Sequence, residues 1–180
     1  MKKLIPILLS ALMFTGCAGT SNNQTNTYRQ ISMDEAVNMM AQETGYIILD
    51  RILYTSTHYP ANYGFIPRTY GDDGDPLDVL LICNQALEPM SLVRAYPIGV
   101  ISMIDNGRFD EKIIAIPFGD PQYNGYRDIW ELPVHIIDEL KHFLSVYKAL
   151  ENKSVHVLEV GSHETATKTI SQSIKKYEDA

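Results

Sequence analysis

Residues 72–78 read Asp72-Asp73-Gly74-Asp75-Pro76-Leu77-Asp78, the most informative seven positions in this 180-residue chain. They place four carboxylates within one short segment, in which Gly74 and Pro76 favour a tight turn. Like charges this close repel and raise one another's pKa values. Hard cations between them relieve the repulsion, and Mg²⁺ typically takes one or two carboxylates together with substrate phosphate oxygens. On composition alone, a solvated acidic loop is an equal alternative to a cation site.

The segments around this turn favour the cation site. Residues 59–67 read Tyr-Pro-Ala-Asn-Tyr-Gly-Phe-Ile-Pro, a rigid aromatic segment that suits a wall holding phenols toward a site. Residues 79–83 follow the turn as an apolar strand pattern. A second charged cluster at residues 105–112 follows another strand pattern, and Tyr147-Lys148 ends a helical one. Together these segments supply carboxylates for metal ions, and cations and phenols for phosphate.

Residues 51 to about 151 are similar to soluble family I inorganic pyrophosphatases. The run Asp73-Gly74-Asp75-Pro76-Leu77-Asp78 matches the signature of that family, and Tyr-Pro-Ala-Asn-Tyr-Gly at residues 59–64 is equally typical. The resemblance implies a Mg²⁺-dependent inorganic diphosphatase, with several ions per site. Such a hydrolase splits pyrophosphate into two phosphates by attack of metal-activated water.

The resemblance also implies roles for individual residues. The general base is expected to be Asp75, and a phenol lining the site is expected to be Tyr59. Metal ligands are expected at Asp73, Asp78, Asp105 and Asp110. Substrate-binding groups are expected at Arg51, Tyr63, Lys112, Tyr147 and Lys148.

The fold implied by the resemblance is mainly β with flanking helices (α+β), an OB-like five-stranded β-barrel. A helix is expected after Pro133, whose fixed φ suits the first helical position, with an apolar stripe at Ile137, Leu140 and Leu144. A second helix is expected at about residues 164–177. Strand patterns are present at residues 46–53, 79–83, 93–104, 112–117 and 155–160.

The N-terminal part of the chain follows a different pattern. Residues 1–17 combine two lysines, an apolar run and small residues before Cys17, which is typical of a signal peptide with a lipobox-like cysteine. An apolar N-terminal helix of a cytosolic protein is the alternative. Residues 18–42 are expected to form a polar tether and a short helix, and residues 43–180 the pyrophosphatase domain. The segment 31–50 resembles the opening of a rhodanese-like domain, although the catalytic cysteine loop of that family does not follow it in the sequence.

One departure from the family pattern lies upstream of the domain. The positions of a phosphate-binding Lys and a site Glu of the family fall on Val37 and Met39. The N-terminal strands of the family are therefore expected to be missing, and the activity to be impaired. The alternative is a non-catalytic protein that binds phosphate or metal.

Charge and resemblance together set expectations for partners and location. The formal net charge of -7 argues against broad nucleic-acid binding, because neutralising phosphates requires clustered Lys and Arg. The expected partner is pyrophosphate, with assembly into a homo-oligomer, a hexamer in bacterial relatives. The resemblance implies a cytoplasmic protein, whereas the N-terminal signal implies an envelope protein whose only membrane contact is a lipid anchor at Cys17.

Overall fold

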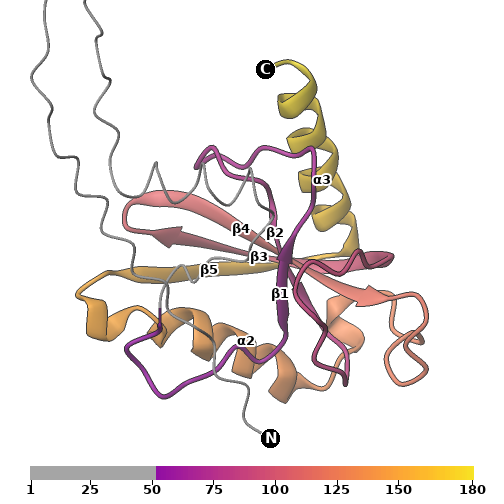
Figure 1. Ribbon diagram of the computed structural model, residues 1–180, viewed down its shortest axis with the longest axis horizontal. Coiled ribbons are helices and arrows are strands. Elements are labelled where there is room, and N and C mark those ends of the chain that lie inside the picture. The colour runs from indigo at the N-terminus through magenta and orange to yellow at the C-terminus, as the bar shows by residue number, and fades with distance from the viewer. Residues whose placement is uncertain (1–51) are drawn as a thin grey trace, which may run out of the picture. The chain divides into compact units, whose positions relative to one another are not determined.

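The computed structural model describes residues 52–180, all within one compact unit that spans residues 50–180 (Figure 1). The expectations for residues 1–42, for Arg51 and for all but the last two residues of the strand predicted at 46–53 lie outside the described residues, and residues 52 and 53 are not in a strand. The elements, in chain order, are β1 (Asn62–Phe65), β2 (Asp78–Leu81), β3 (Ala95–Asp105), β4 (Arg108–Pro117), η1 (Ile129–Glu131), α2 (Val134–Val146), η2 (Ala149–Glu151), β5 (Val155–Ser162) and α3 (His163–Glu178).

The five strands form one mixed sheet in the order β1-β2-β4-β3-β5. Only β2 and β4 pair in parallel, and the other neighbours are antiparallel. The long hairpin β3–β4 turns at Asn106 and Gly107, whose φ values of 49° and 82° are those of a two-residue turn that suits the twist of paired strands. The expected OB-like α+β fold, mainly β with flanking helices, is confirmed.

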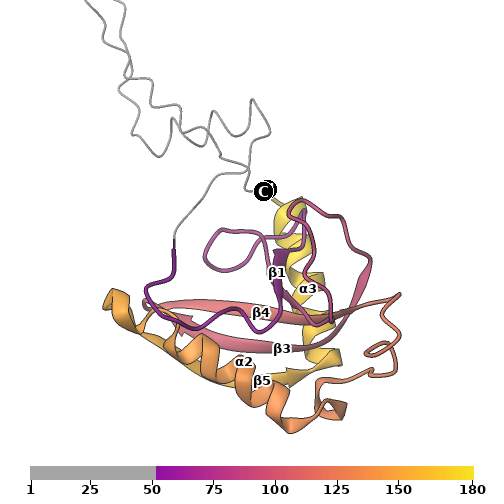
Figure 2. The same ribbon diagram turned by 60° about the horizontal axis from the view of Figure 1, so that its bottom comes forward.

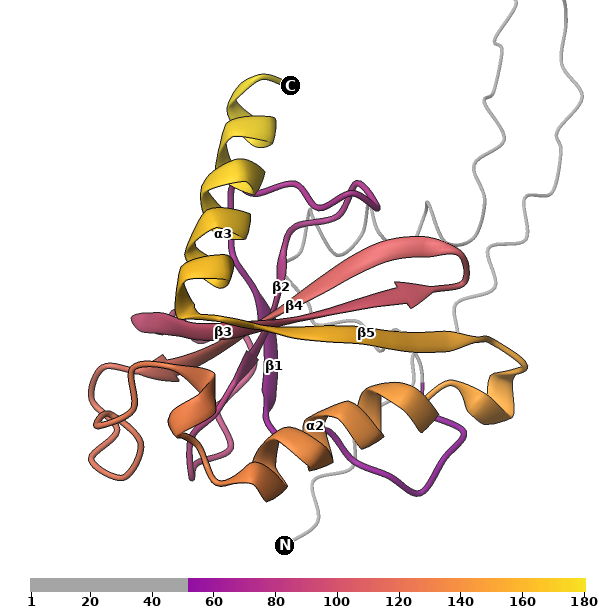
Figure 3. The same cartoon turned by 180° about the vertical axis from the view of Figure 1, so that it is seen from behind.

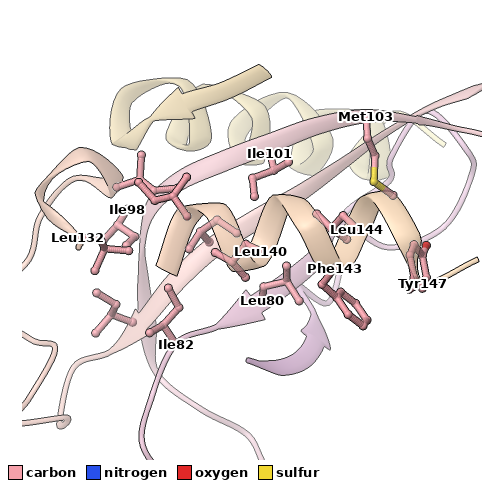
Figure 4. Close-up of a cluster of buried hydrophobic side chains, with 14 residues drawn as sticks. Leu80, Ile82, Ile98, Ile101, Met103, Leu132, Leu140, Phe143, Leu144 and Tyr147 are labelled. Atoms are coloured by element: carbon pink, nitrogen blue, oxygen red, sulfur yellow. The ribbon is translucent and has the colours of Figure 1, made fainter. Parts of the chain in front are cut away.

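The helices α2 and α3 lie on opposite sides of the strands (Figures 1 and 3). On the α2 side, the predicted apolar stripe is buried against the sheet together with Phe143. Figure 4 shows Leu140 and Leu144 between Ile101 and Leu80, with Phe143 beside them and Tyr147 toward the end of the helix. Helix α2 is thus fixed by burial of one face, as is usual for an amphipathic helix.

The α3 side has a smaller apolar cluster. Ala166 of α3 is fully buried with Val100, Ile113 and Leu77, which come from β3, β4 and the end of the acidic turn. Figure 2 shows α3 rising from the end of β5 beside the segment that joins β1 to β2. One face of the sheet therefore packs against α2 and the other against α3, and the acidic turn lies next to α3.

Several boundaries differ from the predictions. Strand β1 was not predicted, because it has only four residues and lies in a segment with prolines at positions 60 and 67. Strand β4 begins at Arg108 rather than at residue 112, because the tight hairpin continues the pairing through charged residues. Pro133 is the residue before α2 rather than its first helical residue. Among residues 52–180, no helix is both long and apolar enough to cross a membrane.

Candidate active site

Strands β2 and β4 bring two carboxylates and a lysine to one face of the sheet. Asp78 and Lys112 are direct partners across the parallel pair, and Asp110 lies two residues before Lys112 on the same face. The Lys112 ammonium donates to Asp78, and its Nζ atom lies 2.7 Å from Oδ2 of Asp110. Only 7% of the Lys112 side chain is exposed. This lysine is therefore a largely buried cation between two acids.

A second acid–lysine pair lies where β3 and α2 end. Asp105 is the last residue of β3 and lies on the same face of the sheet as Met103, two residues earlier. Met103 pairs with Asp110 of β4, so Asp105 and Asp110 are on the same face. The Lys148 ammonium donates to Oδ2 of Asp105, and it lies 5.1 Å from the centre of the Tyr147 ring. The other oxygen of Asp105, Oδ1, is buried and has no hydrogen-bond partner among the described residues. An unpartnered buried carboxylate oxygen is costly in the metal-free fold and is suited to a cation.

The acidic turn has a defined backbone. Gly74 adopts φ +91°, which favours glycine, and the Gly71 amide donates to the Asp75 carbonyl at 2.8 Å. Oδ1 of Asp73 accepts from the Asp75 amide at 3.0 Å. The side chain of Asp75 is exposed, so solvent reaches it directly.

Three phenols adjoin the carboxylates. The Tyr59 ring lies 5.1 Å from that of Tyr63 and 6.4 Å from that of Tyr147, measured between centres. Burial, followed by the charge of Asp105, raises the pKa of Tyr147, which is only 4% exposed. Burial and a hydrogen bond to Asp78 raise the pKa of Tyr63, which is half-exposed. Both groups therefore remain protonated hydrogen-bond donors at neutral pH.

These groups surround one cavity of about 180 Å³. Every predicted site residue within the described part of the chain lines it, and two core leucines complete the wall. The lining residues are Tyr59, Tyr63, Asp73, Asp75, Asp78, Leu80, Asp105, Asp110, Lys112, Leu144, Tyr147 and Lys148. The leucines were not predicted as site residues, although Leu80 lies two positions after Asp78 on the same face.

The cavity has an excess of negative charge. Five aspartates line it against two lysines. Burial raises the pKa of Asp110, and the neighbouring Lys112 opposes that shift. Within residues 52–180, no three acidic, histidine or cysteine side chains converge closely enough to hold one ion, and Lys112 lies between two of the acids. The donor set is oxygen, and the open oxygen of Asp105 also fits hard divalent cations.

Comparison with known proteins identifies the family. The family model for inorganic pyrophosphatase matches residues 30–178. The chain is 45% identical over 138 residues to soluble inorganic pyrophosphatase 2 of Chlamydomonas reinhardtii, covering 77% of this chain and 72% of that protein. It is 46% identical over 136 residues to soluble inorganic pyrophosphatase 1 of Arabidopsis thaliana, covering 76% of this chain and 64% of that one.

A solved structure agrees with both sequence relatives. The inorganic pyrophosphatase of Helicobacter pylori superposes with a TM-score of 0.73 at 43% identity, over 76% of this chain and 82% of that one. The chain belongs to the inorganic pyrophosphatase family. The family match begins at residue 30, upstream of the boundary expected at residue 43. The lipoprotein and rhodanese-like interpretations of residues 1–42 stay predictions.

Proposed function

We propose that this protein hydrolyses inorganic pyrophosphate to two phosphates, with Mg²⁺ as its natural cofactor. The observation that carries the proposal is the single cavity in which five aspartates, two lysines and three tyrosines meet. Aspartates alone would indicate a cation-binding site, and lysines alone would indicate an anion-binding site. Both together suit a substrate that is a polyanion bound with divalent cations.

The metal-side residues are Asp73, Asp78, Asp105 and Asp110. Their carboxylate oxygens come from the acidic turn, from β2 and from the two strands of the β3–β4 hairpin, and all four residues line the same cavity. Bound Mg²⁺ ions neutralise the substrate and lower the pKa of attacking water.

Asp75 accepts the proton of that water. Its exposed carboxylate lines the cavity, and its backbone is fixed by the tight turn. As the water oxygen bonds to one phosphorus atom, the bridging P–O bond breaks and the second phosphate leaves. A positioned general base contributes about 10²–10⁴-fold to such a reaction.

The remaining groups hold the two phosphoryl units. Lys112, Lys148 and the hydroxyls of Tyr63 and Tyr147 face the cavity, and Tyr59 lines it. Arg51 is assigned to the same role by its position in the sequence. Charge-assisted hydrogen bonds of this kind stabilise the charge that develops on the departing phosphate.

Phosphate release from pyrophosphate, with 5 mM MgCl₂ or with EDTA, tests the proposal directly. We expect Mg²⁺-dependent phosphate release, and we expect Asp75→Asn to lower it strongly. The control is Asp138→Asn, which removes the same charge at an exposed position of α2 and should leave the release unchanged. Absence of Mg²⁺-dependent release from a folded protein would favour the non-catalytic alternative. That alternative is not favoured by the site, since ten of the eleven predicted residues line one cavity and the eleventh, Arg51, lies outside the described residues.

The proposal also covers the oligomeric state of the protein and its location in the cell. A homo-oligomer is supported by large apolar residues on the surface, among them Leu92 at 94% and Trp130 at 60% exposed. Light scattering coupled to gel filtration measures the assembly, and a monomer at micromolar concentration would contradict it. Fatty-acid labelling in cells separates a cytoplasmic protein from a lipid-anchored one. Label that disappears in Cys17→Ala indicates the anchor, and unlabelled soluble protein indicates the cytoplasm.

A further inference from the structure

One face of the C-terminal helix α3 contacts the segment that carries the acidic turn. The Tyr70 amide donates to the Ser173 carbonyl at 3.0 Å, and the rings of Tyr70 and Tyr177 lie 5.3 Å apart. One turn of helix away, Nζ of Lys176 lies 2.5 Å from Oδ1 of Asp72. Asp72 directly precedes Asp73. Figure 3 shows this segment running alongside α3 before it reaches β2.

The same helix also holds the strand behind the site. Oγ1 of Thr169 donates to Oε1 of Glu111 at 3.1 Å, and Thr169 is only 7% exposed. Glu111 lies between Asp110 and Lys112 in β4, with its side chain on the opposite face of the sheet. Residues 169, 173 and 176 follow helical spacing, so a single rigid face contacts both β4 and the turn.

The C-terminal end of the turn is held by buried Leu77 and by Asp78 in β2, so the contacts with α3 concern its N-terminal end. The Gly71–Asp75 and Asp73–Asp75 hydrogen bonds join residues of the turn only to one another. The contacts of residues 70 and 72 with α3 join the turn to a helix that is itself anchored by buried Ala166. Thr169 of that helix is in turn bonded to β4, beside Asp110.

We propose that α3 positions the acidic turn against β4, with Lys176 acting as a positioning residue through Asp72. This rests on the proposed function, because the groups so positioned are its metal-side residues Asp73 and Asp110. Lys176 touches neither substrate nor metal. It holds Asp72 and so positions Asp73, the next residue, relative to Asp110, the two carboxylates that would take part in holding Mg²⁺.

The test compares Lys176→Met with Lys175→Met. Both remove one positive charge from adjacent positions of α3, but no ion pair of Lys175 is present among residues 52–180. Mg²⁺ affinity is measured by calorimetry without substrate, and kcat and KM for pyrophosphate are measured separately. We expect Lys176→Met to weaken Mg²⁺ binding and to lower kcat by about two- to fivefold, the range of a half-exposed ion pair, with KM little changed. Lys176→Arg restores both values.

The salt dependence of Mg²⁺ binding and a second pair of variants test the same role independently. The difference between the two methionine variants shrinks in 1 M NaCl, because exposed charges are screened over about 3 Å there. Thr169→Val, which keeps the shape but loses the bond to Glu111, weakens Mg²⁺ binding as well, whereas Thr167→Val on the exposed face does not.

Equal Mg²⁺ affinity in the two methionine variants, with unchanged thermal midpoints, overturns the positioning role. A parent protein that binds Mg²⁺ but releases no phosphate overturns the proposed function instead. In that case the calorimetric comparison still decides the role of Lys176.

Discussion

Asp78 and Lys112 are direct neighbours across the only parallel strand pair of the described sheet, and Lys112 also reaches Asp110 at 2.7 Å. The buried lysine pairs with both acids and offsets one of their two negative charges. It is thus both a part of the fold and a candidate phosphate ligand. These two roles can be separated by experiment.

Lys112→Met leaves two acids in a mostly buried site without their cation. Removing one partner of a buried pair costs about 3–5 kcal/mol of unfolding free energy, and we expect that loss in EDTA. Mg²⁺ recovers part of it, because the ion supplies the missing positive charge, but turnover stays about 10²–10³-fold lower. Urea unfolding with and without Mg²⁺ measures the first effect.

The control for this variant is Lys175→Met. Lys175 is exposed and has no ion pair among residues 52–180, so its removal costs little unfolding free energy. Equal losses in the two variants would show that Lys112 is not a structural cation.

Asp75→Asn and Asp78→Asn are expected to separate chemistry from metal binding. Asp75 is exposed on the turn and is the proposed general base, so Asp75→Asn should lower turnover by about 10²–10⁴-fold with little change in Mg²⁺ affinity. Asp78 lies on β2 and is a proposed metal ligand, so Asp78→Asn should weaken Mg²⁺ binding and turnover together. Calorimetry and steady-state kinetics measure both. Mg²⁺ affinity within a few-fold of the parent in Asp78→Asn would make the metal assignment wrong.

Part of this site could be predicted from the sequence because its residues form local patterns. The turn at residues 72–78 is dense in acids, and alternation along a strand places Asp110 and Lys112 on one face. The apolar stripe predicted at Ile137, Leu140 and Leu144 likewise lies in the core, and Tyr147 joins the same cluster three residues after Leu144.

What could not be predicted depends on contacts between distant segments. Lys176 and Asp72 are 104 residues apart, and nothing in either local pattern indicates the ion pair. The short strand β1 exists because β2 pairs with it, although prolines lie on both sides. The early start of β4 follows from a hairpin turn whose charged arms resemble a loop in the sequence.

Tyr147→Phe is expected to change how stability depends on alkaline pH. Burial raises the pKa of Tyr147 above the value of about 10 that it has when unfolded, so the folded state keeps a proton that the unfolded state loses. Stability is complete below pH 10 and falls above it, by about 1.4 kcal/mol at pH 11 for one such group. Unfolding free energies at pH 9 and pH 11 should therefore differ less in the variant than in the parent. The same drop in both proteins would contradict the shift.

Val37→Lys combined with Met39→Glu tests the departure from the family pattern at residues 37 and 39, which lie within the matched range 30–178. These positions lie outside the described residues, and their assignment rests on the resemblance alone. If a phosphate contact is missing there, restoring it supplies roughly 2–4 kcal/mol of transition-state stabilisation, or about 30- to 1000-fold in rate. Pyrophosphate turnover of the double variant is compared with that of the parent. An unchanged rate would show that another basic residue already reaches the phosphate.

The effect of Mg²⁺ on the stability of the folded protein can be measured without pyrophosphate turnover. The cavity holds three more acids than lysines, and Oδ1 of Asp105 has no partner among the described residues. Mg²⁺ should therefore bind the folded state far better than the unfolded chain, and Mg²⁺ at 100 times its dissociation constant adds about 2.7 kcal/mol of stability. Asp105→Asn breaks the largely buried ion pair with Lys148, so it should lower the thermal midpoint in EDTA, and it should also reduce the rise on adding Mg²⁺. Asp138→Asn, the exposed control, should keep the full Mg²⁺ response. A response as large in Asp105→Asn as in the control would place the ions away from Asp105.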